Sequence, residues 1–76
     1  MKNNFDKELG DTLRQIREEK KIPASVVADR LGVSKQAVSY WELGDRALKA
    51  VTLRDYCEIL GVTMQYVFDR MDGADL

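Results

Sequence analysis

The stretch of residues 31–44 carries four side chains that can donate or accept hydrogen bonds. They are Lys35, Gln36, Ser39 and Tyr40. On a helical wheel at ~100° per residue these four lie within one arc of roughly 140°, and no acidic side chain lies among them. Val38 and Trp41 fall on the opposite, apolar side of the wheel. A helix of this kind would pack through its apolar side and present the polar arc for recognition by hydrogen bonds.

The chain lacks the groups of residues that catalysis or metal binding would need. It has no histidine, a single cysteine, no glycine-rich phosphate loop and no serine with a base nearby in sequence. A zinc site alone would need at least three such ligands. We therefore expect no catalytic residue, no metal, no cofactor and no small-molecule substrate. The cysteine, Cys57, lies in an apolar helical pattern and is expected in the core.

The charges are unevenly distributed along the chain, although the formal net charge is only −1. Residues 14–49 carry eight lysines and arginines against five acids, a net charge of +3. Residues 50–76 carry two arginines against five acids, a net charge of −3. A polyanion would bind the middle of such a chain and be repelled by its end. On charge alone, a surface of mixed sign is an equally good interpretation.

The length of 76 residues predicts one domain that spans the chain. A chain this short buries only ~60–65% of its unfolded surface, so it needs an efficient core or self-association. No run approaches the roughly 18 apolar residues of a membrane helix. The N-terminal residues also lack the apolar block of a signal peptide. We expect a cytoplasmic protein without a membrane partner.

The apolar spacing between the glycine and proline residues predicts five short helices and no sheet. The predicted ranges are about 4–20, 23–31, 35–43, 52–60 and 63–71, followed by a frayed tail at 72–76. The predicted N-caps are Asn4, Ser34, Thr52 with Asp55 as a variant capping box, and Thr63. The first helix would bury one stripe, made of Phe5, Leu9, Leu13 and Ile16.

The second and third predicted helices are separated by a very short turn that contains Gly32, and such a pair forms a helix-turn-helix unit, here about residues 24–43. Further residues at characteristic spacing extend from about Leu9 to Phe68. They are Arg17, Ala28, Gly32, Val33, Ser34, Val38, Trp41, Glu42, Gly44, Leu53, Leu60, Gly61 and Val62. With these residues the sequence resembles the Cro/phage-repressor (XRE-like) helix-turn-helix family. The resemblance implies an all-α, compact five-helix lambda-repressor-like domain that binds double-stranded DNA.

The resemblance also implies that the third helix enters the DNA major groove and that the four residues of the polar arc meet base edges. Gln36 can bond adenine through N6 and N7, and Lys35 can donate to guanine or to a phosphate. Ser39 can donate or accept. Tyr40 can reach a phosphate or pack on a thymine methyl group. Without the resemblance, a solvated polar face would be the simpler interpretation of Lys35 and Gln36.

Phosphate contacts are expected on both sides of the third helix. The candidates are Ser25, Ser34, Arg46, Lys49 and Arg14. For each lysine or arginine alone, an ordinary solvated charge is an equally good interpretation. In the resembled family, the positions of Arg17 and Glu42 form a partly buried ion pair. We expect this pair to orient the third helix by tying it to the first.

Some residues depart from the family pattern. The family commonly has glycine where Lys21 stands, and serine or threonine followed by glutamine where Pro23 and Ala24 stand. That glutamine usually contacts a phosphate and braces a residue of the third helix, and Ala24 can do neither with its side chain. Leu48 replaces a common proline, and Leu43 projects from the polar arc. These departures and the net charge of −1 predict weak nonspecific DNA binding.

The resulting hypothesis is a sequence-specific transcriptional regulator, a repressor, that acts as a homodimer in the bacterial cytoplasm, whether encoded by a bacterium or a phage. Useful specificity needs two half-sites about 34 Å apart. The candidate dimer residues are Leu48, Val51, Met64, Tyr66, Phe68 and Met71. For the methionines and aromatic residues among them, core filling is an equally good interpretation. The second hypothesis is a protein-binding module on the same fold, of the antitoxin or anti-regulator type.

Overall fold

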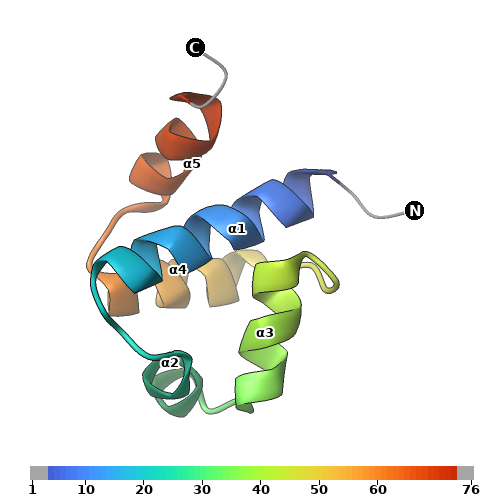
Figure 1. The fold of residues 1–76 in the computed structure, drawn as a ribbon, viewed down its shortest axis with the longest axis vertical. Helices are drawn as coiled ribbons and strands as arrows, with labels where there is room; N and C mark the ends of the chain where they lie inside the picture. Colours follow the sequence, from blue (N-terminus) through green and yellow to red (C-terminus); the bar gives the residue numbers. More distant parts are fainter. Residues whose placement is uncertain (1–3, 74–76) are drawn as a thin grey trace.

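The computed structural model describes residues 4–73, and side chains up to residue 71. The described residues form five helices (Figure 1): α1 (Asn4–Glu19), α2 (Ala24–Leu31), α3 (Lys35–Leu43), α4 (Ala50–Leu60) and α5 (Met64–Gly73). Within residues 4–73 the structure contains no strand. The predicted all-α, five-helix architecture is therefore confirmed.

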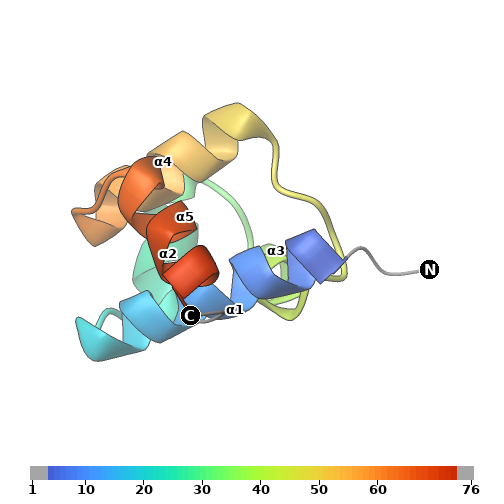
Figure 2. The same cartoon turned by 90° about the horizontal axis from the view of Figure 1, so that it is seen from above.

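Helix α1 organises the domain because it contacts both α3 and α5, while α2 packs against α3 and α4. Figure 1 shows α1 crossing the molecule, with α2 and α3 below it and α5 above its middle. Figure 2 shows that α4 lies on the far side of the core from α1, and that α5 runs from the end of α4 back toward α1. The arrangement leaves one long side of α3 without a covering helix.

The core consists of the apolar stripes of the five helices. Its buried hydrophobic residues are Leu9, Leu13, Ile16, Val27, Ala28, Val38, Leu53, Tyr56, Cys57, Leu60 and Val67. One member of the predicted α1 stripe behaves differently, since Phe5 is 47% exposed. Its ring lies 6.3 Å from that of Phe68, centroid to centroid. The buried part of the stripe therefore begins at Leu9, because the first turn of α1 reaches beyond the core.

The caps that frame α3 are the ones that the sequence predicts. The Ser34 hydroxyl accepts a hydrogen bond from the Ala37 amide at 3.0 Å. Gly32 adopts the left-handed conformation with φ 69°, and this allows the chain to leave α2 and enter α3 within three residues. Thr63 caps α5 in the same way as Ser34, accepting from the Tyr66 amide at 3.0 Å.

The predicted start of α4 is wrong. Thr52 lies inside the helix, which begins at Ala50 after Lys49 as N-cap, and Asp55 pairs with Arg54 instead of forming a capping box. No proline or glycine lies between residues 45 and 52, so nothing stops the helical conformation from extending two residues further back. Similarly, α1 already includes Asn4, so its capping position lies outside the described residues.

The end of the chain also differs from the prediction. Helix α5 continues to Gly73, although fraying was expected from residue 72 onward. The rest of the predicted tail, residues 74–76, lies outside the described residues.

Lys21 ends α1 in a conformation that usually requires glycine. Its φ is 59°, and within the described part of the chain it is the one non-glycine residue with a positive φ. The backbone amides of Lys21 and Ile22 donate to the carbonyls of Glu18 and Arg17, which closes the end of the helix. A left-handed lysine costs about 1 kcal/mol. The turn it makes places the Ile22 carbonyl beside the Arg17 guanidinium.

Candidate nucleic-acid interface

Helix α3 presents its polar arc to solvent and its apolar side to the core. Lys35, Gln36 and Ser39 are exposed, and Tyr40 is half-buried. On the other side, Val38 is completely buried and Trp41 packs against the core. The capped N-terminus of α3 leaves its first turn accessible. A helix held in this way can enter the groove of a duplex, whose major groove is about 12 Å wide.

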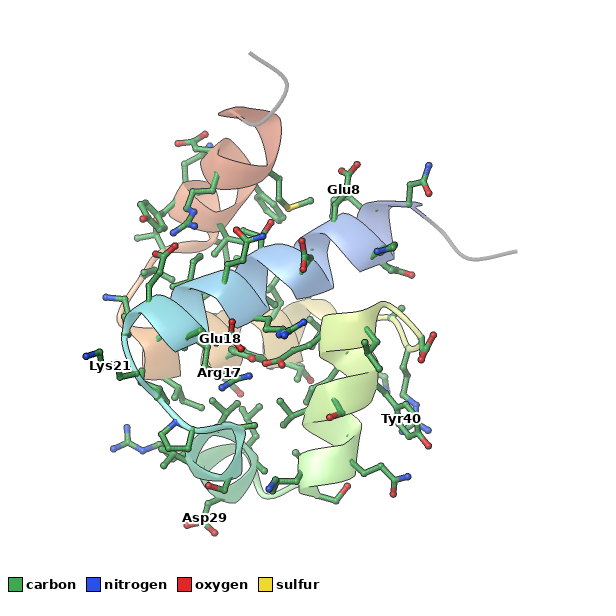
Figure 3. All side chains as sticks on the ribbon, in the orientation of Figure 1. Glu8, Arg17, Glu18, Lys21, Asp29 and Tyr40 are labelled. Atoms are coloured by element: carbon green, nitrogen blue, oxygen red, sulfur yellow. The ribbon has the colours of Figure 1, made fainter. Side chains whose placement is uncertain are left out.

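The outer edge of the arc is joined to the loop that follows α3. The side-chain amide of Gln36 donates a hydrogen bond to the Tyr40 hydroxyl at 3.0 Å. The guanidinium of Arg46 lies over the Tyr40 ring, 4.8 Å from its centroid. Figure 3 shows Tyr40 projecting from α3 on the side away from α1 and α2. The structure therefore brings together two predicted base-contacting residues and one predicted phosphate-contacting residue.

The inner edge of the arc borders an open groove of about 290 Å³ where α1, α2 and α3 meet. Ser39, Leu43, Arg14 and Ala24 are among its lining residues. The Leu43 side chain is 54% exposed, so it does not anchor α3 in the core. Ala24 presents only a methyl group to this groove, at the position where the resembled family has its bracing glutamine. Ser39 and Gln36 therefore face different surroundings although they share one helical face.

The other predicted phosphate-contacting residues lie around α3 at the surface. Ser25 is exposed in the first turn of α2, and Lys49 is exposed just before α4. The oxygen of Ser34 accepts the capping hydrogen bond, and its hydroxyl hydrogen is left to donate outward. Arg14 forms a solvent-exposed ion pair with Glu18 at 3.3 Å. The phosphate-contacting roles of these residues remain predictions.

A buried network of polar side chains connects α3 to α1 and α4. Arg17 of α1 donates from Nε to Glu42 Oε2 at 2.8 Å and from Nη2 to Glu42 Oε1 at 3.1 Å. The side chains are only 12% and 8% exposed. Arg17 Nη1 also donates to the Ile22 carbonyl at 2.9 Å. Figure 3 shows Arg17 pointing from α1 into the space between α2 and α3. The hydrogen bonds to Glu42 raise the pKa of Arg17, which favours the charged guanidinium.

The third member of this network is Tyr56 of α4, which the sequence analysis did not identify as a polar contact. Its hydroxyl donates a hydrogen bond to Glu42 Oε2, and its side chain is completely buried. Helical spacing placed Tyr56 in the apolar stripe of its helix, which is correct for the ring but says nothing about the hydroxyl. The only available signal was that a buried tyrosine usually needs a polar partner.

Tyr56 makes the stability of the domain sensitive to alkaline pH. Burial, followed by the hydrogen bond to Glu42, raises the pKa of Tyr56 above its ordinary value. Unfolded tyrosine loses its proton near pH ~10. The contribution of Tyr56 to stability is therefore fully present below that pH and is lost as the pH rises above it, by at most about 1.4 kcal/mol per pH unit.

We expect Tyr56→Phe to reduce this alkaline loss of stability. Urea unfolding between about pH 8 and pH 11 would measure it for both proteins. The variant removes a hydrogen bond to the ion-paired Glu42 carboxylate, so at neutral pH it should lose about 1.5–3 kcal/mol. Equal slopes of stability against pH in the two proteins would contradict the assignment.

The predicted dimer residues differ in how far they are exposed. Val51, Met64 and Tyr66 are well exposed, whereas Leu48, Phe68 and Met71 are partly buried against the core. Arg70 of α5 donates to both carboxylate oxygens of Glu19 at 2.7 Å. Its guanidinium also lies 5.9 Å from the centroid of the Tyr66 ring. This ion pair joins α5 to α1 and places the Arg70 guanidinium beside the Tyr66 ring.

The fold and the exposed α3 together define a helix-turn-helix DNA-binding domain, and sequence comparison agrees. The helix-turn-helix family model matches residues 13–67. The chain belongs to this helix-turn-helix family, which is of the XRE type. The members it resembles are regulators rather than enzymes, which supports the expectation that this chain has no catalytic activity. None of the helices in residues 4–73 has the length and apolarity needed to cross a membrane.

Individual relatives place the chain within the family. YqaE of Bacillus subtilis, an uncharacterised helix-turn-helix-type transcriptional regulator, is 33% identical over 59 residues. The match covers 78% of this chain and 51% of YqaE, so the chain spans about half the length of that relative. A crystal structure of ClgR, the clp gene regulator of C. glutamicum, has a TM-score of 0.85 and 26% identity and covers 91% of this chain and 90% of that one. A second ClgR structure, with a TM-score of 0.89 and 24% identity over 97% and 79% of the two chains, supports the fold alone.

Proposed function

We propose that the chain is a sequence-specific regulator, a repressor, that inserts α3 into the major groove of double-stranded DNA. The observation that carries this proposal is the contrast between the two sides of α3. One side is fixed by Val38 and by the buried contact of Glu42 with Arg17, and the other exposes hydrogen-bonding groups without an acid. The proposed place of action is the bacterial cytoplasm.

In this proposal the roles of the side chains follow from their positions. Lys35 and Gln36, in the first turn of α3, contact base edges, and Ser39 contacts a base with weaker discrimination. Ser25, Ser34, Arg46 and Lys49 contact phosphates on either side, and they set the register of the helix on the duplex. Arg14 reaches a phosphate from the rim of the groove described above.

We also propose that two copies bind one operator with two-fold symmetry. One recognition helix covers only a few base pairs, and two half-sites about 34 Å apart multiply the specificity. The exposed Met64 and Tyr66 of α5, which are 38% and 45% exposed, support a dimer surface on this helix. Sedimentation of the complex should give two chains for each operator.

The second candidate function is a protein-binding module, and the exposure of Leu43 favours it. An apolar side chain that is 54% exposed on the recognition face suits a protein partner better than a phosphate backbone. The acidic last third of the chain would supply the remaining contacts.

The dependence of binding on salt distinguishes the two functions. For operator DNA, the slope of log K against log salt should be about −0.9 for each phosphate contacted. Lys49→Ala should reduce the magnitude of that slope by about one. Arg54→Ala is the matched control, because Arg54 is an exposed cation on α4, and it should leave the slope unchanged. A slope near zero, or no DNA bound at low salt, would contradict the proposed DNA-binding function.

A further inference from the structure

We propose that Tyr40 is a specificity-determining positioning residue, whose hydroxyl orients Gln36 and whose ring holds Arg46. The inference rests on the proposed function and goes further, since it couples a base contact to a phosphate contact through one side chain. It also replaces the independent base-contacting role that the sequence suggested for Tyr40.

The hydroxyl contact selects one orientation of the Gln36 amide. The amide has two N–H groups and one carbonyl oxygen, and one N–H group donates to the Tyr40 hydroxyl at 3.0 Å. The second N–H group and the oxygen remain, and these are the donor and acceptor that adenine N7 and N6 require. Gln36 is exposed, so without this hydrogen bond its amide would sample several rotamers before binding. Fixing the amide beforehand lowers the entropic cost of the base contact.

The ring contact holds a cation of the loop that follows α3. Arg46 lies beyond the end of α3 and is itself exposed. Its guanidinium stands 4.8 Å from the centroid of the Tyr40 ring, which is within the range of a cation–π contact. The half-burial of Tyr40 holds the ring in place. A guanidinium that is stacked on an aromatic ring keeps its N–H groups free to bind a nearby phosphate.

The brace for Gln36 comes from its own helix, because Tyr40 lies one turn further along α3.

The test uses DNA selected by the unsubstituted protein from a random pool. Gln36→Ala first identifies the base step that depends on Gln36. Tyr40→Phe keeps the ring and removes the hydroxyl, so preference at that same step should fall roughly three- to tenfold. The salt slope should stay unchanged, and Tyr40→Phe should have no further effect in the Gln36→Ala background. Gln15→Ala, which removes an exposed glutamine of α1 that hydrogen-bonds Asp11 one turn away, is the control and should alter no base preference.

The second arm tests the ring. Tyr40→Leu should relax the same base step and also reduce the magnitude of the salt slope by about one, as Arg46→Ala does. Combining Tyr40→Leu with Arg46→Ala should reduce the salt slope no further than either substitution alone. If Tyr40→Leu does not fold, as judged by its thermal melt, Arg46→Lys tests the stacking instead, because it keeps the charge and loses the planar group.

The inference is overturned if Tyr40→Phe changes a base step other than that of Gln36, or if its effect adds fully to that of Gln36→Ala. Either result would mean that Tyr40 reads a base by itself. An unchanged preference in Tyr40→Phe would also overturn it. If the unsubstituted protein selects no sequence at all, the proposed function fails, and this inference fails with it.

Discussion

Replacing Glu42 by glutamine is expected to lower the free energy of unfolding by about 3–5 kcal/mol. The reason is that Glu42 neutralises the guanidinium of Arg17 in a site where both side chains are almost completely buried. Glu42 also accepts the hydroxyl hydrogen bond of Tyr56. An uncompensated charge in the centre of the domain should also loosen α3, so DNA affinity should fall even where the variant is still folded.

A double-mutant cycle with Arg17→Met measures the coupling. The double variant should lose less stability than the two single variants together, because it leaves no unpaired charge. The exposed pair of Arg14 and Glu18 is the matched control, and Glu18→Gln should cost at most about 0.5 kcal/mol. Urea unfolding gives each value. If Glu42→Gln costs as little as Glu18→Gln, the buried pair does not orient α3.

Replacing Gly10 by alanine is expected to destabilise the domain by roughly 3 kcal/mol. Gly10 lies in α1 where that helix crosses the end of α3. A Cβ atom there would stand 2.2 Å from the carbonyl oxygen of Trp41 and 2.7 Å from that of Glu42. Both atoms belong to the backbone of α3, so only a displacement of the helix could relieve the contact. Since the displaced helix is the proposed recognition helix, DNA affinity should fall as well.

The direction of the stability change in Gly10→Ala distinguishes the steric contact from helix propensity. Helix propensity alone would favour alanine over glycine in α1 by about 1 kcal/mol. Gly32→Ala is the control, because its Cβ would meet nothing within 4 Å. That variant should cost only the left-handed conformation, about 1 kcal/mol. Thermal melts of the two variants compare the stability lost to the close contact at position 10 with the stability lost to the left-handed conformation at position 32. A stabilised Gly10→Ala protein would contradict the close packing of α1 and α3.

Much of the fold could be predicted from the sequence because it follows local rules. Apolar spacing marked the buried stripes, and Ser34 and Gly32 marked the turn between α2 and α3. The start of α4 was predicted wrongly because threonine at position 52 is a good N-cap only if the residues before it are not helical, and here the helix already begins at Ala50. Phe5 matched the spacing of the α1 stripe, but spacing cannot show how far the core extends.

The site was less predictable because its contacts join distant parts of the chain. The pairing of Arg17 with Glu42 was expected only from the family resemblance. The hydroxyl of Tyr56 could not be assigned, since its partner lies 14 residues away on another helix. The stacking of Arg46 on Tyr40 depends on the path of a loop, and no periodic pattern describes a loop. Gly10 carries no side chain, so nothing in its sequence context showed the close approach of α3.

Selection of bound DNA from a random pool shows whether the polar arc of α3 recognises base edges. We expect a two-fold symmetric consensus, and we expect Gln36→Ala to lose preference at one base step in each half-site while the other positions remain. The expected loss is about 1–3 kcal/mol of discrimination at that step. A uniform loss of affinity at every position would make Gln36 a backbone contact. Failure of the unsubstituted protein to select any sequence would contradict the account as a whole.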